Sequence, residues 1–141
     1  MIKGATALFA VVTLLVGCGG AEQPPEPDKP KADASAIEIE GDRDEPVNRL
    51  AIEAIADLQQ YWTEQFPTLY GEDYRPLEGK LWALTSESEA GSECATNYSD
   101  VAGNAFYCKL DDSISWDAEN LLPSIQKKYG DFAIPVVLAH E

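Results

Sequence analysis

The chain contains very little histidine and cysteine, and basic residues are scarce. Its 141 residues include one histidine, His140, and three cysteines. Because a catalytic zinc ion needs three protein ligands, this histidine content excludes a site made only of imidazoles. Lys and Arg number 10 against 25 Asp and Glu, a formal net charge of −15. This acidity argues against nucleic-acid binding and against adsorption to anionic lipid.

Apolar runs of membrane-spanning length are also missing. Residues Gly4 to Gly17, behind Lys3, carry no charge and are mostly Ala, Val, Leu and Phe. This stretch has the length of a signal-peptide core and is too short to span a bilayer comfortably. It ends in LVGC, which looks like a bacterial lipobox. We therefore expect residues 1–17 to be a lipoprotein signal peptide and Cys18 to carry the lipid. The alternative is an ordinary signal peptide with an incidental cysteine. Either way the protein is exported. With the lipid, it is anchored in the cell envelope on the extracytoplasmic side of a membrane.

Lipidation of Cys18 leaves an even pair, Cys94 and Cys108. In an oxidising compartment this pair is expected to form a disulfide. A zinc half-site made of the two cysteines is the competing interpretation. Their spacing argues against it, because paired cysteines of structural zinc sites lie two to four residues apart and need two further ligands.

Residues 18–45 are rich in proline and acidic side chains and poor in large apolar ones. Such a segment buries too little surface to offset the entropy of ordering. We expect a solvated linker that holds the folded part away from the membrane. Within it, Ile37 to Glu40 alternates apolar and acidic residues, a pattern compatible with a short strand.

The folded part is expected over residues 46–141, which carry a net charge of −10. Asp44-Glu45-Pro46 is typical of a helix start. The apolar residues from Val47 to Trp62 recur at three- and four-residue steps, which predicts an amphipathic helix ending near Phe66-Pro67. We interpret this stripe as core packing.

Strand patterns follow the first helix. Residues 77–84 predict one strand, and residues 104–109 and 113–117 predict a hairpin that turns at residues 110–112. Ile114 and Trp116 alternate with polar residues, as expected of a half-buried strand. The fold class is therefore expected to be α+β.

Two helices are expected near the end of the chain. Asp117 is the expected cap of a helix over residues 118–129, with Gly130 as its stop signal. Asp131 is the expected cap of a second helix that carries the apolar run before His140. Pro135 is compatible with that helix only in its first turn.

Several short motifs occur in a fixed order from residue 104 to the end, NAFYCKLDDSISWDAENLLPSIQKKYGDFAIPVVLAHE. This stretch resembles the bacterial neutral zinc metallopeptidases. In that family a hairpin of NAFYC and D-x-I-x-W-D type precedes LLP, YGDFA and VLAHEWGH. The resemblance begins near Tyr61 and is densest from Gly103. It implies that residues 46–141 are the N-terminal part of a zincin-like metallopeptidase domain, with an edge hairpin and the start of an active-site helix.

The resemblance also implies roles for individual residues. In an H-E-x-x-H helix, two histidines bind Zn²⁺ and the glutamate after the first activates the bound water. His140 is thus the expected metal ligand and Glu141 the expected catalytic base. In thermolysin-like peptidases, substrate adds to a strand that opens with Asn-Ala-Phe. Asn104 and Ala105 are thus expected to contact the substrate main chain. The alternative is an ordinary buried hairpin in which Asn104 caps a turn.

Two functions are compatible with these features. The first is an exported, membrane-anchored zinc peptidase that hydrolyses peptide or protein substrates. The second histidine of the motif would fall after Glu141, so the chain is expected to be an incomplete and inactive fragment of that enzyme. The alternative is a non-enzymatic envelope lipoprotein, a binding or scaffold module that has kept the fold without the metal. The nucleotides after codon 141 discriminate between the two.

Overall fold

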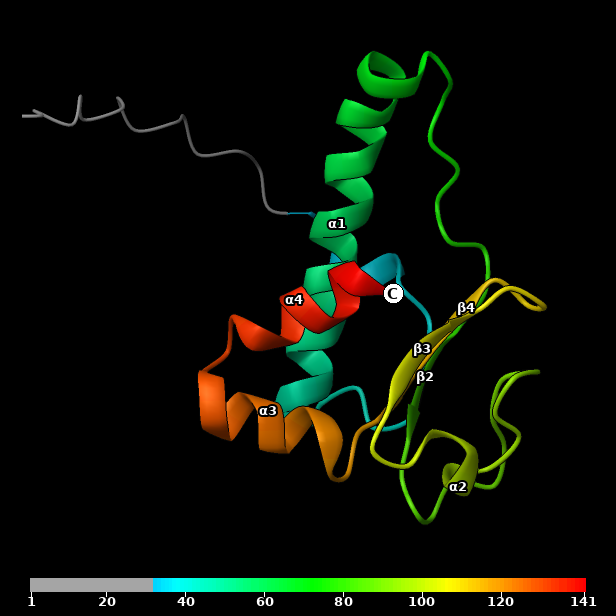
Figure 1. Cartoon of the computed structure of the whole chain (residues 1–141), viewed down its shortest axis with the longest axis vertical. Helices are drawn as coiled ribbons and strands as arrows, with labels where there is room; N and C mark the ends of the chain where they lie inside the picture. Colours follow the sequence, from blue (N-terminus) through cyan, green and yellow to red (C-terminus); the bar gives the residue numbers. More distant parts are fainter. Residues whose placement is uncertain (1–31) are drawn as a thin grey trace, which may run out of the picture.

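The computed structural model describes residues 32–141, which form a small mixed sheet with helices on both faces (Figure 1). The elements are a 3₁₀ turn η1 (Ala34–Ala36), β1 (Ile39–Glu40), α1 (Pro46–Tyr70), β2 (Leu81–Leu84), α2 (Tyr98–Val101), β3 (Ala105–Cys108), β4 (Ser113–Asp117), α3 (Leu121–Tyr129) and α4 (Ala133–His140). Helices α1, α3 and α4 share one hydrophobic core with the sheet, and α2 packs on its other face. The expected α+β class is confirmed.

The strands lie in the order β1-β2-β4-β3. β2 runs parallel to both β1 and β4, with Leu81 opposite Ile39 and Ile114. β3 and β4 are antiparallel, with Ala105 opposite Trp116. The expected hairpin is therefore confirmed, and it places β3 at an edge of the described sheet.

The expected solvated linker is wrong over residues 34–43, which join the fold. Ile37 and Ile39 pack against the core, and β1 adds a parallel strand to β2. The Arg43 guanidinium donates hydrogen bonds to the carbonyls of Ile37 and Ala34, at 2.7 and 2.6 Å. These contacts offset the loss of conformational entropy when the segment becomes ordered. The composition of the segment alone predicts that this loss would keep it unfolded. The predicted lipidation site, Cys18, lies outside the described residues.

The predicted start of α1 is confirmed, and it rests on Glu45 and Pro46. The Glu45 carboxylate accepts hydrogen bonds from the amides of Val47 and Asn48, at 2.7 and 3.1 Å. Pro46 occupies the first turn, where its missing N–H costs nothing. The capped end lies against the sheet, and the buried first half of α1 supplies much of the core.

The predicted end of α1 near Pro67 is wrong, because the helix continues to Tyr70 with Pro67 inside it. Pro67 donates no backbone hydrogen bond, but its fixed φ is compatible with a helix. Ring contacts of Phe66 stabilise the last turn, with centroids 4.5 Å from Tyr70 and 5.8 Å from Tyr74. Gly71 then ends the helix in a left-handed conformation, φ 75°, and its N–H donates to the Pro67 carbonyl.

β4 is not half-buried as predicted, since all five of its residues are buried. Ile114 and Trp116 contact the helical core. On the other face, the Ser115 hydroxyl donates to the Ser92 hydroxyl at 3.0 Å, and both side chains are buried. β4 lies between two strands and has structure on both faces, so its polar residues are buried with partners.

The loop that covers this second face is attached by a disulfide. Cys94 and Cys108 form a disulfide, and their Cα atoms lie 5.7 Å apart. The pair expected from the cysteine count is thus the pair that the fold brings together. The bridge fastens the loop before α2 to the end of β3.

Neither of the two aspartates expected as caps does cap its C-terminal helix, and α3 begins at Leu121, later than predicted. Asp117 Oδ1 accepts from the amides of Glu119 and Asn120, at 2.9 and 2.7 Å, so it orders a turn before α3 instead of capping a helix at residue 118. Asp131 does not cap α4, whose first residue is Ala133. Its carboxylate instead accepts from the Gln126 side chain, at 2.9 Å.

The remaining helix signals agree with the structure. Gly130 ends α3 as predicted, and Pro135 lies in the first turn of α4. β2 is shorter than the expected strand over residues 77–84, because the amides of Leu77 and Gly79 pair with α1 and with the hairpin turn instead. None of the helices within residues 32–141 combines the length and the hydropathy that crossing a membrane requires.

Candidate functional site

The candidate catalytic pair lies at the C-terminal end of α4. Ile134 and Leu138 are buried and fasten α4 to α1 and to the sheet. His140 is exposed, and Glu141, which is partly buried, donates its backbone N–H to the Val137 carbonyl at 3.4 Å. The end of α4 is therefore held by apolar packing one turn before the two polar residues.

His140 and Glu141 line a cleft of about 490 Å³ that we call the aromatic cleft. One wall is the second half of α1, and the others are residues 74–77 and the β3–β4 hairpin. Figure 1 shows α1 extending past α3 and α4, the chain returning to β2 through residues 71–80, and the C-terminus between α1 and the hairpin. Leu58 and Ile114 supply part of the apolar lining.

Aromatic rings follow one another along the α1 wall. The centroids of Trp62 and Phe66 are 6.3 Å apart, and Phe66 contacts both Tyr70 and Tyr74. We call these four residues the aromatic ladder. Tyr70 is 61% exposed. The stripe interpreted from sequence as core packing is thus core only in the first half of α1, whereas its second half faces a hollow.

Opposite the ladder, Tyr107 and Asp112 form the hairpin side of the cleft. The Tyr107 hydroxyl donates to Asp112 Oδ1 at 2.7 Å. This hydrogen bond is the main reason that the pKa of Tyr107 is raised, with desolvation and the Asp112 charge adding to it. Arg75 lowers the same pKa, so its positive charge acts at this end of the cleft.

Asp112 also connects the hairpin turn to the segment before β2. Its Oδ2 accepts from the Glu78 amide at 2.7 Å, and its carbonyl accepts from the Gly79 amide at 3.0 Å. Asp112 itself has φ 52°, in the left-handed region that aspartate tolerates better than most residues. Desolvation and the Asp112 charge raise the pKa of Tyr74. One carboxylate therefore positions two sides of the cleft.

The predicted substrate contacts, Asn104 and Ala105, lie at the opposite end of β3 from Cys108. Asn104 is exposed, and its carbonyl accepts from the Asp117 amide at 3.0 Å. Ala105 is buried in the core and pairs with Trp116. Among the residues of β3, the cleft is lined by Tyr107. The structure thus places His140 and Glu141 with Tyr107, two positions along the strand from Ala105.

The described residues supply only part of a metal site. Within residues 32–141, no three His, Cys, Asp or Glu side chains lie close enough together to hold a metal ion. The other carboxylate of the aromatic cleft, that of Asp112, already accepts two hydrogen bonds. At the end of α4, the cleft is therefore lined by one imidazole, that of His140, and one carboxylate, that of Glu141.

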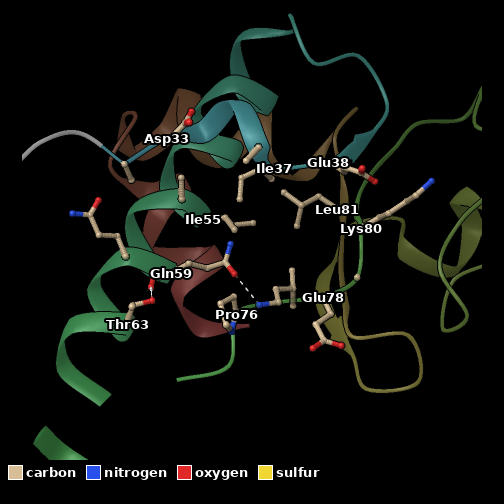
Figure 2. Close-up of a pocket in the computed structure, with 16 residues that line it drawn as sticks. Asp33, Ile37, Glu38, Ile55, Gln59, Thr63, Pro76, Glu78, Lys80 and Leu81 are labelled. Carbon is tan, nitrogen blue, oxygen red and sulfur yellow. Dashed lines mark hydrogen bonds between the residues drawn. The ribbon is translucent and has the colours of Figure 1, made fainter. Parts of the chain in front are cut away.

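A second cavity, of about 500 Å³, lies between η1, α1 and the start of β2 (Figure 2). Figure 2 shows the Gln59 side chain pointing toward the segment between Pro76 and Glu78. There the Leu77 amide donates to Gln59 Oε1 at 2.8 Å. Lys80 at its rim is paired with Glu40, 2.5 Å away, and this pairing raises the Lys80 pKa. Its central polar groups are thus occupied in holding the fold together, and it holds neither candidate catalytic residue.

Sequence reasoning missed the ladder and Tyr107 as site residues. The signal for the ladder was present, since Trp62, Phe66 and Tyr70 recur every four residues past the last buried residue of α1. The signal for Tyr107 was its period-two relation to Ala105, which places both side chains on one face of a strand.

The chain was compared with known proteins. No protein-family profile, no curated protein and no solved structure matches it.

Proposed function

We propose that this protein is the N-terminal part of an exported, lipid-anchored zinc peptidase. In this proposal His140 is the first zinc ligand of an H-E-x-x-H helix and Glu141 is its general base. A second histidine would lie four positions after His140, on the same helical face.

The observation that carries the proposal is the position of His140 and Glu141 on the same cleft as the edge strand β3. A peptidase needs a catalytic group beside a surface that holds an extended substrate. An unpaired sheet edge supplies such a surface, because its outward N–H and C=O groups can pair with another strand. Tyr107 connects the two features, since it belongs to β3 and lines the cleft.

The register of the hairpin supports a role for Ala105 as well. The Asp117 amide donates to the Asn104 carbonyl, so this pair faces inward across the hairpin. Because hydrogen-bonded and non-hydrogen-bonded positions alternate, the main-chain groups of Ala105 and Tyr107 are directed toward the open edge. An incoming peptide would therefore pair with Ala105 and Tyr107 in line with the end of α4.

The residues present supply part of a zinc site but do not complete it. His140 is exposed at the cleft and supplies one imidazole, whereas catalytic zinc requires three protein ligands. The proposal therefore needs ligands beyond the described residues, and of these it names only the second histidine of the motif.

The proposal gives a role to each of the chain's own residues at this site. Zinc, when bound, would acidify a water molecule at the site. Glu141, which is partly buried and lines the cleft, would take a proton from the attacking water. Ile134 and Leu138 position the pair by holding α4 against α1.

The first test is the reading frame after codon 141. The proposal predicts a histidine at the third codon beyond Glu141. The protein from that frame is then assayed for zinc by elemental analysis and for cleavage of an unstructured protein such as casein. His140→Ala should lose both zinc and cleavage, and His140→Gln serves as a second variant of similar size.

The result that contradicts the proposal is a stop codon directly after Glu141, or zinc content and cleavage unchanged in both His140 variants. A chain that ends there and folds stably without metal would instead be the non-enzymatic envelope lipoprotein.

A further inference from the structure

We propose that the aromatic cleft selects peptide segments that carry a lysine or arginine side chain, and that the cation lies on the Tyr70 and Tyr74 rings beside Glu72 and Asp73. The term substrate in this inference rests on the proposed function, but the binding itself does not.

Three rings of the aromatic ladder lie close together at the end of α1. Phe66 lies 4.5 Å from Tyr70 and 5.8 Å from Tyr74, measured between centroids. A cation within about 6 Å of a ring face is attracted by the ring quadrupole. Because Phe66 lies this close to each tyrosine, one ammonium or guanidinium group can contact Phe66 together with Tyr70 or with Tyr74. An exposed Tyr70 leaves that contact open to a ligand.

The aromatic cleft has a neighbouring hollow. A second hollow of about 480 Å³ shares Phe66, Tyr74 and Tyr107 with the aromatic cleft. Glu72 and Asp73 line this outer hollow, directly after the helix end at Gly71. The two hollows therefore adjoin at these shared residues, with His140 and Glu141 on one and the acidic rim of Glu72 and Asp73 on the other. We call the two hollows together the groove.

Most of the charged residues that line the two hollows are acidic. The groove is lined by the carboxylates of Glu72, Asp73, Glu78, Asp112 and Glu141. Against these five stands one guanidinium, that of Arg75. Arg75 acts on Tyr107 at the hairpin side, where Asp112 opposes it. Arg75 lines both hollows, but the carboxylates outnumber it, so the groove carries an excess of negative charge. The aromatic and acidic groups both favour a cationic occupant.

The alternative occupants fit less well. An acidic peptide would meet four uncompensated carboxylates of the groove, and nucleic acid would meet a chain with a net charge of −15. A purely apolar peptide would use the rings but leave the rim without a partner. The groove therefore favours a peptide with one basic side chain next to apolar ones.

The experiment uses the full chain in a non-ionic detergent and blocked five-residue peptides that differ at the central residue. Lysine, arginine, norleucine and glutamate are compared by isothermal titration, so no cleavage, zinc or catalytic base is needed. The lysine and arginine peptides should bind about five-fold or more tightly than the norleucine peptide. The glutamate peptide should bind weakest, and the lysine preference should fall as salt is raised.

Two variants test the groove itself. Tyr70→Leu keeps apolar area but removes the ring, and Glu72→Gln with Asp73→Asn removes the rim charge. Each should reduce the preference for lysine over norleucine at least two-fold. The matched controls are Tyr129→Leu, at a tyrosine on α3 that is 65% exposed, and Glu87→Gln with Glu89→Gln, at exposed acids of another loop. Both controls should leave the preference unchanged.

Circular dichroism and the denaturation midpoint verify that each variant is folded. The inference is overturned if the lysine peptide binds no better than the norleucine peptide, or if both groove variants keep the full preference. It is also overturned if the control variants reduce the preference equally, which would indicate attraction to overall charge. A zinc-loaded enzyme that cleaves peptides without regard to basic residues would contradict this inference and leave the proposed function standing.

Discussion

The indole nitrogen of Trp116 donates a hydrogen bond to the side-chain oxygen of Asn48 at 3.1 Å, and both residues are buried. Trp116 belongs to the central strand β4, and Asn48 lies in the first turn of α1. The Asn48 amide nitrogen also donates to the Asp42 carbonyl at 2.9 Å. This pair orients α1 on the sheet, and the position of the cleft wall follows from that orientation.

Asn48→Ala should destabilise the fold by about 1–3 kcal/mol, because it leaves the buried Trp116 N–H without a partner. Chemical denaturation measures the effect. In a Trp116→Phe background the same substitution should cost less, since the indole donor is already gone. Equal costs in both backgrounds would show that the Asp42 contact, and not the pair, accounts for the loss.

The bridge between Cys94 and Cys108 should stabilise the fold by about 3 kcal/mol, the value expected for closing a loop of about 15 residues. Denaturation curves with and without reductant measure it. Because reductant acts only on the bridge, a variant with Cys94→Ala and Cys108→Ala should be unaffected by it. Quantitative alkylation of both thiols in freshly exported, unreduced protein would contradict the disulfide.

Tyr107 should ionise above the ordinary tyrosine value of about 10, because its hydroxyl donates to Asp112 and that charge disfavours phenolate. Its stabilising contribution is therefore complete below the unfolded pKa and is lost as pH rises through the folded pKa. Absorbance titration of the phenolate, compared with Tyr107→Phe, isolates this group. Asp112→Asn should move the titration back to lower pH, and an unchanged titration in that variant would contradict the assigned cause.

Glu141→Gln should retain zinc but lose peptide cleavage by about 10²–10⁴-fold, because the amide cannot accept the proton. The measurement is made in the protein that includes the continuation after Glu141. Glu87→Gln, at an exposed acid in the loop after β2, is the control and should leave cleavage intact. If Glu141→Gln cleaves as fast as the parent, Glu141 is not the general base and the peptidase proposal is wrong.

Cys18 should carry lipid when the chain is expressed in a bacterial host. The protein should partition into detergent and incorporate labelled palmitate. Cys18→Ala should lose both properties, because the thioether that attaches the diacylglycerol needs the cysteine sulfur. Their persistence in Cys18→Ala would favour a different means of export.

Several features could be predicted because their causes lie within a few residues of one another. Glu45 and Pro46 mark the start of α1, and Gly130 marks the end of α3, through backbone preferences that hardly depend on the rest of the fold. The β3–β4 hairpin follows from alternation on either side of a tight turn. The Cys94–Cys108 pair follows from counting, once Cys18 is assigned to a lipid.

Other features depend on partners that are distant in the sequence. β1 becomes a strand because β2, some forty residues later, offers it a free edge. β4 is buried on both faces because separate segments cover it, which its own alternating pattern does not reveal. Helical spacing likewise could not show that the core ends midway along α1.

The sequence alone indicated most of the helices and strands, and it marked His140 and Glu141 as candidate catalytic residues. Only the tertiary structure decided that these two residues share a cleft with Tyr107 and the aromatic ladder. The physical reason is that backbone preferences act between neighbouring residues. The walls of a cleft, by contrast, are set by how buried side chains such as Trp116, Asn48 and Leu138 pack helices onto the sheet.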